Sequence, residues 1–236
     1  MLGTGNTSNV VVAKGYAVKR YHDRRAGESR KQFRSRVESE YLLLKSLDHP
    51  HVVAVAKFTT NWLGDTPKMY MELGKPNWWL NCQNKAEAMA QIVMAVVYLH
   101  HQGIAHRDLK LDNTVMVGGL VKLVDFAVAT KAVPAVGLVG SASYVAPEQY
   151  TQISYLGAAS DVWSVAMIFV RLFKVAPWWK SAHISDLVYQ EYAGGGALPA
   201  PVPEWVAQAL TIDPEQRPSM DTIASLVDPH AITDAH

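Results

Sequence analysis

The sequence predicts an α+β protein with two lobes, a small β-rich N-lobe that carries one main helix and a larger, mostly helical C-lobe. Three observations support this fold class: short β-branched runs occur before residue 75, one amphipathic helix interrupts them, and the longest segments after residue 83 have helical composition and periodicity. A chain of 236 residues can bury a core of this size. The lobes are expected to join near residues 72–75.

The N-lobe is expected to contain strands on either side of one helix. Residues 9–21 hold two β-rich runs around Lys14-Gly15, which is a hairpin signal. Over residues 30–50, apolar side chains recur at spacings of three or four, which predicts an amphipathic helix that ends near the proline closing that range. Residues 51–73 return to strand character, with a turn at Gly64-Asp65.

Helices are expected to dominate the C-lobe. Residues 84–103 combine good helix formers with an apolar stripe, and Gly103 is a plausible C-cap. Residues 120–128 predict a short strand, and residues 160–175 predict a buried helix with Ser160 as its N-cap. The chain is expected to close with a loop over residues 193–203 and short helices over residues 203–210 and 219–227.

Composition excludes several classes of protein. The net charge of +1 argues against a broad surface for nucleic acid or anionic membrane, and the basic run at residues 19–36 is read as a solvated loop and helix start. A single cysteine, Cys82, allows no internal disulfide and no Cys/His zinc set, which fits a reducing compartment. The N-terminal residues do not resemble a signal peptide, and the longest apolar tract, broken by Arg171, is too short to span a bilayer. We expect a monomer in the cytoplasm, with the nucleus as a second location.

Charged and polar side chains are concentrated at residues 106–113, HRDLKLDN, between apolar segments. Buried charges need partners, and a phosphate with its metal ions would provide them. The segment matches the pattern H-R-D-L-K-x-x-N, so the chain resembles the protein kinase family in its serine/threonine branch. The resemblance implies that Asp108 orients the substrate hydroxyl and accepts its proton, Lys110 faces the transferred phosphoryl group, and Asn113 holds magnesium. Taken singly, an Asp or Asn here would be an ordinary turn residue.

Two further features of this region need an interpretation. The DFA segment that begins at Asp125 resembles the D-F-G element, so Asp125 would chelate magnesium. Ala127 replaces the glycine, which would cost about 1–2 kcal/mol if the position requires a left-handed conformation. His106 lies near two other histidines, but no matching ligand set follows, so a buried and hydrogen-bonded histidine is favoured over a metal ligand.

Other motifs follow in the order typical of the family. The letters APE stand at residues 146–148 and DVWS at residues 161–164. By resemblance, Asp161 would brace the catalytic loop, and Arg217 would form a buried structural pair with Glu148.

The resemblance also assigns a phosphate-anchoring lysine, Lys19 in YAVKRY. Its partner should be a glutamate on the following helix, either Glu38 or Glu40. These two lie two residues apart and cannot share a helix face. The family spacing to the HP dipeptide at residues 49–50 favours Glu40.

The start of the chain, GTGNTSNV, resembles the Gly-rich loop G-x-G-x-x-G-x-V, whose backbone N–H groups approach phosphate oxygens. Ser8 occupies the third glycine position, and the first strand is expected to be truncated because Met1 lies close before the loop. For the apolar positions, plain core packing is an equally good explanation. By resemblance, ATP would contact Gly3, Thr4, Gly5, Asn6, Val10, Ala17, Lys19, Met71, Glu72, Leu73, Val115 and Asp125.

Residues 125–148 would form the activation segment. Gly137 stands where many relatives carry a phosphorylated threonine, so we expect that Arg107 does not need a phosphate at that site. Ser141 resembles the hydroxyl that normally bonds the catalytic aspartate.

The resemblance covers nearly the whole chain and implies one kinase domain over residues 1–236, with an N-lobe at 1–71, a hinge at 72–75 and a C-lobe at 76–236. The sequence of this chain is also similar to that of the fungal halotolerance and nutrient-permease regulatory kinases. The implied reaction is ATP- and magnesium-dependent phosphorylation of serine or threonine in protein substrates. Asp112 suggests substrates with upstream basic residues.

Two alternatives stay open. A pseudokinase that acts as a binding scaffold would agree with Ala127, Ser8 and the short first strand. A small-molecule phosphotransferase is a second alternative, although the APE and DVWS motifs and Arg217 favour the protein kinase branch.

Overall fold

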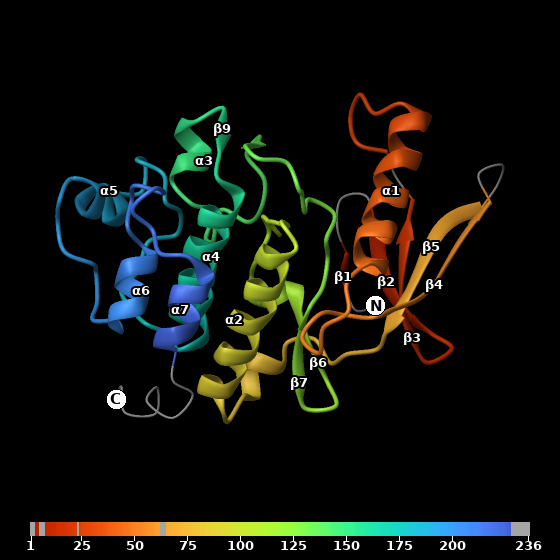
Figure 1. Cartoon of the computed structure of the whole chain (residues 1–236), viewed down its shortest axis with the longest axis horizontal. Helices are drawn as coiled ribbons and strands as arrows, with labels where there is room; N and C mark the ends of the chain where they lie inside the picture. Colours follow the sequence, from red (N-terminus) through yellow and green to blue (C-terminus); the bar gives the residue numbers. More distant parts are fainter. Residues whose placement is uncertain (1–2, 5–7, 23, 62–64, 228–236) are drawn as a thin grey trace.

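The computed structural model describes residues 3–4, 8–22, 24–61 and 65–227, and it has two lobes (Figure 1). The elements of the N-lobe are β1 (Gly3–Thr4), β2 (Ser8–Ala13), β3 (Tyr16–Tyr21), α1 (Arg30–Lys45), β4 (Val55–Asn61) and β5 (Asp65–Glu72). The strands form an antiparallel sheet in the order β1-β2-β3-β5-β4, and α1 packs against β4. The expected β-rich lobe with one main helix is therefore confirmed.

The predicted hairpin is formed by β2 and β3. Its two-residue loop, Lys14 and Gly15, has positive φ angles of 52° and 79°, as a type I′ turn requires. Lys19 pairs with Val10 of β2 and with Met69 of β5, so it lies on an interior strand of the sheet.

Helix α1 begins as its sequence predicts but ends early. Ser29 and Gln32 form a capping box at its N-terminus, with Ser29 N–H donating to Gln32 at 2.8 Å. The helix was expected to run to about Pro50 but ends at Lys45, with Ser46 as its C-cap; the Ser46 hydroxyl bonds the Leu43 carbonyl at 2.7 Å. The expected turn at Gly64-Asp65 is only partly covered: Gly64 lies outside the described residues and Asp65 begins β5.

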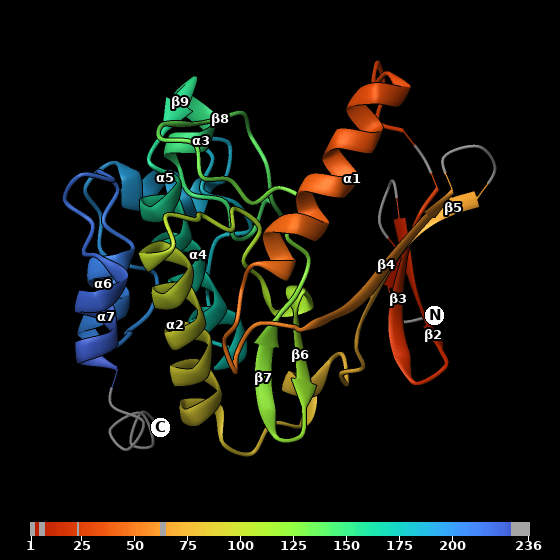
Figure 2. The ribbon, with the colours of Figure 1, turned by 45° about the vertical axis from the view of Figure 1, so that its right-hand side comes forward.

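The C-lobe is mostly helical, as expected, and Figure 2 shows its two-stranded hairpin beside α2. Its elements are η1 (Trp78–Asn81), α2 (Lys85–His101), η2 (Leu111–Asn113), β6 (Thr114–Val117), β7 (Leu120–Leu123), β8 (Ala135–Val136), α3 (Glu148–Thr151), β9 (Ser154–Tyr155), α4 (Gly157–Leu172), α5 (Leu187–Ala193), α6 (Glu204–Ala209) and α7 (Met220–Leu226). The helices α6 and α7 confirm the two predicted closing helices. Helix α5 was not predicted. In the described part of the chain, no helix is both long and apolar enough to span a bilayer.

Two predicted helix caps need correction. Gln102 is the C-cap of α2, and Gly103 follows it with a φ of 68°, so that the N–H of Ile104 bonds the Leu99 carbonyl in a Schellman arrangement. Helix α4 begins at Gly157 rather than after Ser160. The Ser160 hydroxyl does not cap a helix; it is buried and donates to a carboxylate on α3.

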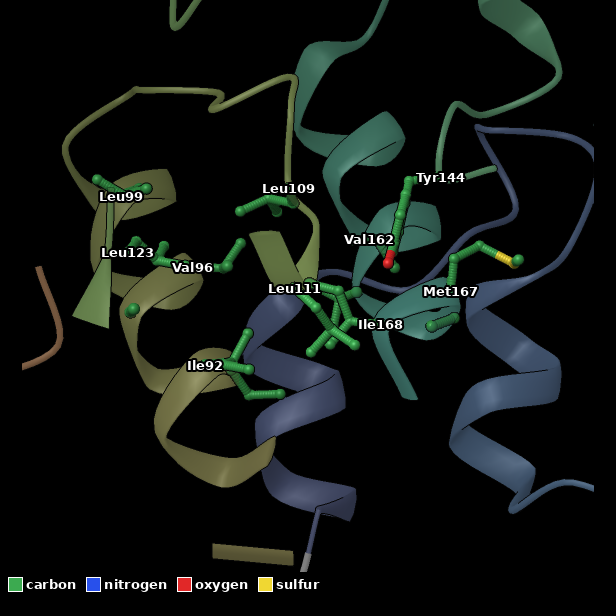
Figure 3. Packing of buried hydrophobic residues seen from close by; sticks show 14 of the residues in the cluster. Ile92, Val96, Leu99, Leu109, Leu111, Leu123, Tyr144, Val162, Met167 and Ile168 are labelled. Carbon is green, nitrogen blue, oxygen red and sulfur yellow. The ribbon is translucent and has the colours of Figure 1, made fainter. Parts of the chain in front are cut away.

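The central core lies between α2 and α4. Figure 3 shows Val96 and Leu99 of α2 facing Val162 and Ile168 of α4, with Leu109 and neighbouring residues between them. Nearly every α4 residue is buried, which agrees with its expected role as a buried helix. Leu109 and Leu111, which belong to the HRDLKLDN segment, are part of this core and anchor that segment to it.

Candidate active site

Two adjoining cavities lie between the sheet of the N-lobe and the C-lobe, with volumes of about 370 Å³ and 360 Å³. They share the lining residues Ser8, Lys19, Glu40, Lys110 and Asp125. The larger cavity extends toward β5 and the connection after it, whereas the smaller one extends toward Asp108. Lys19, Glu40, Lys110 and Asp125 therefore line both cavities, whereas Asn113 lines only the larger one and Asp108 only the smaller one.

Lys19 lies at the centre of an ionic cluster. Its ammonium group contacts Glu40 Oε1 at 2.6 Å and Asp125 Oδ1 at 2.8 Å. Burial lowers the pKa of Lys19, but the two carboxylates more than offset this and raise it above its usual value. Lys19 therefore stays protonated at neutral pH. Burial also raises the pKa of Glu40, in opposition to the attraction of Lys19.

The choice between the two glutamates is settled by the direction of α1. Glu40 is buried and faces β3, whereas Glu38 is exposed to solvent. The contact partner of Lys19 is therefore Glu40, as its spacing predicted.

Substituting these two glutamates separates an ion-pair role from a general charge effect. We expect Glu40→Gln to lower kcat/KM for ATP by about 10- to 100-fold, the equivalent of one hydrogen bond to a charged group of about 1.5–3 kcal/mol. Glu38→Gln removes the same charge from an exposed site of the same helix and should stay within about twofold of the wild type. Steady-state kinetics at varied ATP measures both. Equal losses in the two variants would contradict a specific role for Glu40.

Strand β7 ends at Leu123, earlier than the predicted residue 128. Asp125 follows it with a φ of 63° and lines both cavities. Partial burial raises its pKa, but Lys19 and the hydrogen bonds it receives outweigh this and lower the pKa to about 2. Asp125 is therefore a carboxylate at neutral pH. Ala127 is absent from the positive-φ residues of the described chain, so the expected left-handed penalty for alanine does not arise here.

The polar side chains of residues 108–113 contact one another. Asp108 Oδ2 accepts from Lys110 at 2.9 Å and from the Asn113 amide at 2.8 Å. Ser141 donates to Asp108 Oδ1 at 3.3 Å and accepts from Lys110 at 2.8 Å. The carboxylate of Asp108 is thus held by one ammonium group, one amide group and one hydroxyl group.

The loop is held from the core by Asp161 of α4, as predicted. The carboxylate of Asp161, which is fully buried, accepts from the backbone N–H groups of His106 at 2.7 Å and Arg107 at 2.8 Å. His106 is buried, bonds the Val124 carbonyl at 3.2 Å and packs on the Phe126 ring. The structure thus agrees with a buried, hydrogen-bonded His106.

The remaining predicted nucleotide contacts are only partly brought together. The larger cavity is lined by the predicted residues Val10, Ala17, Met71, Glu72 and Val115. Leu73 is not among the lining residues. Gly3 and Thr4 form β1, and Gly5 and Asn6 lie outside the described residues.

Several lining residues were not predicted, among them Val53, Val124 and Tyr21. Isolated apolar or aromatic residues in strands carry no signal that separates a cavity wall from ordinary core.

The donor set at this site fits a magnesium ion. Asp125 supplies a carboxylate to the larger cavity, and Asn113, whose amide nitrogen is used as a donor to Asp108, has its amide oxygen left for a cation. Oxygen donors of these two kinds are those that Mg²⁺ prefers, usually together with water and substrate phosphates. Among the described residues, no group of three or more His, Cys, Asp or Glu side chains forms another metal site.

Comparisons with known proteins agree with this geometry. Residues 1–226 match the family model described as "Protein kinase domain". The chain is 34% identical over 196 residues to serine/threonine-protein kinase hal4 of Schizosaccharomyces pombe, which covers 75% of this chain and 30% of that protein. It is 32% identical over 217 residues to the nitrogen permease reactivator protein of Saccharomyces cerevisiae, which covers 82% of this chain and 27% of that protein. The chain therefore spans less than a third of the length of these two relatives.

Proposed function

Because the chain belongs to the protein kinase family, we propose that it transfers the terminal phosphoryl group of ATP to serine or threonine hydroxyls of proteins, with magnesium. The observation that carries this proposal is the convergence of Lys19, Glu40, Asp108, Asn113 and Asp125 around two joined cavities. Phosphoryl transfer needs alignment and charge neutralisation more than covalent chemistry from the protein. The side chains of this site could meet both requirements, since they include groups that align the reactants and groups that neutralise charge.

The larger cavity would hold the nucleotide. Lys19, kept charged by Glu40, would bind phosphate oxygens, and the apolar walls from Val10, Ala17 and Val115 would enclose the base. Asn113 and Asp125 would hold magnesium, which when bound neutralises charge on the phosphates.

The smaller cavity would hold the acceptor side chain of the substrate. Asp108 would orient the hydroxyl and accept its proton as the oxygen bonds phosphorus and the bond to the ADP leaving group breaks. Lys110, 2.9 Å from Asp108 and 2.8 Å from Ser141, would stabilise the charge that develops on the phosphoryl oxygens.

The proposed kinase function also suggests which molecules the chain acts on and where it acts. The substrates would be proteins, and Asp112, exposed at the rim of the larger cavity, would favour basic residues upstream of the acceptor. We further propose that the chain acts as a monomer inside the cell, in the cytoplasm or nucleus, without a nucleic-acid partner and without a membrane span. A scaffold without activity is the alternative, and the filled charged positions argue against it.

A thermal-shift and turnover experiment tests the proposed function. Mg-ATP should raise Tm, since a ligand at about 100 times its Kd stabilises the folded state by about 2.7 kcal/mol. ATP with EDTA should give a smaller shift, and Lys19→Met should abolish most of it. Wild-type protein should also phosphorylate serine or threonine peptides from a mixed array. A Tm shift without turnover on any peptide would favour the scaffold. If Mg-ATP gave no Tm shift and no turnover, ATP would be excluded as a substrate.

A further inference from the structure

The guanidinium group of Arg107, next to Asp108 in the chain, is bound entirely by neutral oxygen atoms. Its Nε donates to the Tyr155 hydroxyl at 2.9 Å, and its Nη2 donates to the carbonyls of Val136 and, at 3.2 Å, Gly137. The Tyr155 hydroxyl donates in turn to the Gly137 carbonyl at 3.1 Å. Among the described residues, no carboxylate pairs with Arg107.

Tyr155 is buried in this arrangement and contacts Arg107 through both its hydroxyl and its ring. It is 3% exposed, and the guanidinium lies 5.5 Å above the centre of its ring. Strand β9, which contains Tyr155, pairs with β8 so that Tyr155 lies opposite Ala135. Burial raises the pKa of Tyr155, so the phenol keeps the proton that it donates to Gly137.

The cluster formed by Arg107, Tyr155 and Gly137 is connected to the acceptor-binding part of the site. Three residues after Gly137, a Cβ added at Gly140 would lie 2.8 Å from the Arg107 carbonyl oxygen, so the two backbones touch. The next residue, Ser141, bonds Asp108 at 3.3 Å. A displacement of residues 136–137 would therefore be transmitted to Asp108 through Gly140, which packs on the Arg107 backbone, and through Ser141, which bonds Asp108.

Gly137 itself is unsuited to a phosphorylated side chain. Its φ is 82°, a region that β-branched residues such as threonine rarely adopt. The oxygen atoms that Arg107 requires come instead from Tyr155 and two backbone carbonyls.

We propose that Tyr155 is a positioning residue that fixes the activation segment on Arg107, so that the segment reaches its working conformation without an added phosphate. This inference rests on the proposed kinase function. It assigns to Tyr155 and Gly137 the place that a phosphate would otherwise occupy beside Arg107. Tyr155 does not touch the reacting atoms and acts through Arg107 and residues 136–141.

A pair of tyrosine substitutions tests the role of Tyr155. Tyr155→Phe removes one buried hydroxyl and should lower kcat about 10-fold, with KM for ATP within about twofold, because the N-lobe contacts are untouched. The control is Tyr192→Phe, since the Tyr192 hydroxyl donates to a backbone carbonyl, that of Leu210, at 2.8 Å far from the site. That control should keep kcat within twofold. If both variants lose kcat equally, or if Tyr155→Phe matches the wild type, the positioning role is wrong.

A second experiment is independent of turnover. Hydrogen exchange measured by mass spectrometry on wild type and Tyr155→Phe should show faster exchange in peptides that cover residues 133–141, with α4 peptides unchanged. Uniform acceleration throughout the C-lobe would indicate general destabilisation and contradict the proposal. Because this readout needs no ATP, it separates failure of the positioning role from failure of the kinase function.

The absence of a phosphate requirement is tested directly. Protein treated with a phosphatase, and shown by mass spectrometry to be unmodified between residues 125 and 148, should keep kcat within about twofold of untreated protein. A loss of more than 10-fold that maps to a modified residue of this segment would overturn the proposal.

Discussion

Asp108→Asn is expected to lower kcat by about 10²- to 10⁴-fold, the range that general base catalysis supplies, while Mg-ATP still raises Tm as in the wild type. Asparagine keeps the shape of the side chain and can still accept from Lys110 and Asn113, which contact Asp108 at 2.9 Å and 2.8 Å. It cannot take a proton from the substrate hydroxyl at neutral pH. The effect should therefore fall on the chemical step and leave nucleotide binding almost unchanged.

The matched control is Asp221→Asn, which removes the same charge from an exposed site on α7, where Asp221 pairs with His101 at 2.8 Å. That variant should keep the wild-type kcat. Single-turnover assays on one peptide, together with melting curves for each protein, distinguish a catalytic defect from misfolding. If Asp108→Asn retains more than a tenth of the wild-type kcat, Asp108 is not the base.

Arg217→Met is expected to cost about 3–5 kcal/mol of unfolding free energy, because it leaves the Glu148 carboxylate buried without its cation. The two side chains are almost fully buried, with exposed fractions of 0% for Arg217 and 1% for Glu148. Arg217 also donates to the carbonyls of Ala159, at 2.8 Å, and Ile212, at 3.1 Å. Urea unfolding followed by tryptophan fluorescence measures the loss, since Arg217 lies over the Trp163 ring.

Two further variants sharpen this test. Asp221→Asn alters a contact with the His101 ring in which both side chains are largely exposed, at 60% and 58%, and should cost at most about 1 kcal/mol. The double variant Glu148→Leu with Arg217→Met removes both charges and should be less destabilised than the sum of the single changes. Costs that simply add would mean that the two side chains do not act as a pair.

The sequence predicted those site residues that lie close together in one short motif. The HRDLKLDN segment identified Asp108, Lys110 and Asn113, and the structure brings these three side chains into contact. Helix geometry alone showed only that Glu38 and Glu40 cannot both face β3, and the choice of Glu40 came from the family spacing to the HP dipeptide at residues 49–50.

Helix ends and long-range contacts were less predictable. Ser160 has the composition of an N-cap, but Gly157 begins α4 three residues earlier, where its missing Cβ permits close packing on Ala105. The contact of Tyr155 with Arg107 joins residues 48 positions apart in the chain. No local pattern marks such a partner, since the hydroxyl is placed by the pairing of β8 with β9 and by the core beneath.

The dual pairing of Lys19 has a mechanical consequence. One ammonium group bonds a carboxylate of its own lobe, Glu40, and one of the other lobe, Asp125, at 2.6 Å and 2.8 Å. Hinge bending that widens the cleft must break the contact with Asp125 but can leave the contact with Glu40 intact. Lys19 would then move with the sheet while still paired with Glu40. The phosphates of the proposed nucleotide would compete with Asp125 for the ammonium group of Lys19. Widening of the cleft is thus opposed by the contact between Lys19 and Asp125, in addition to the ion pair between Lys122 of β7 and Glu72 at the end of β5.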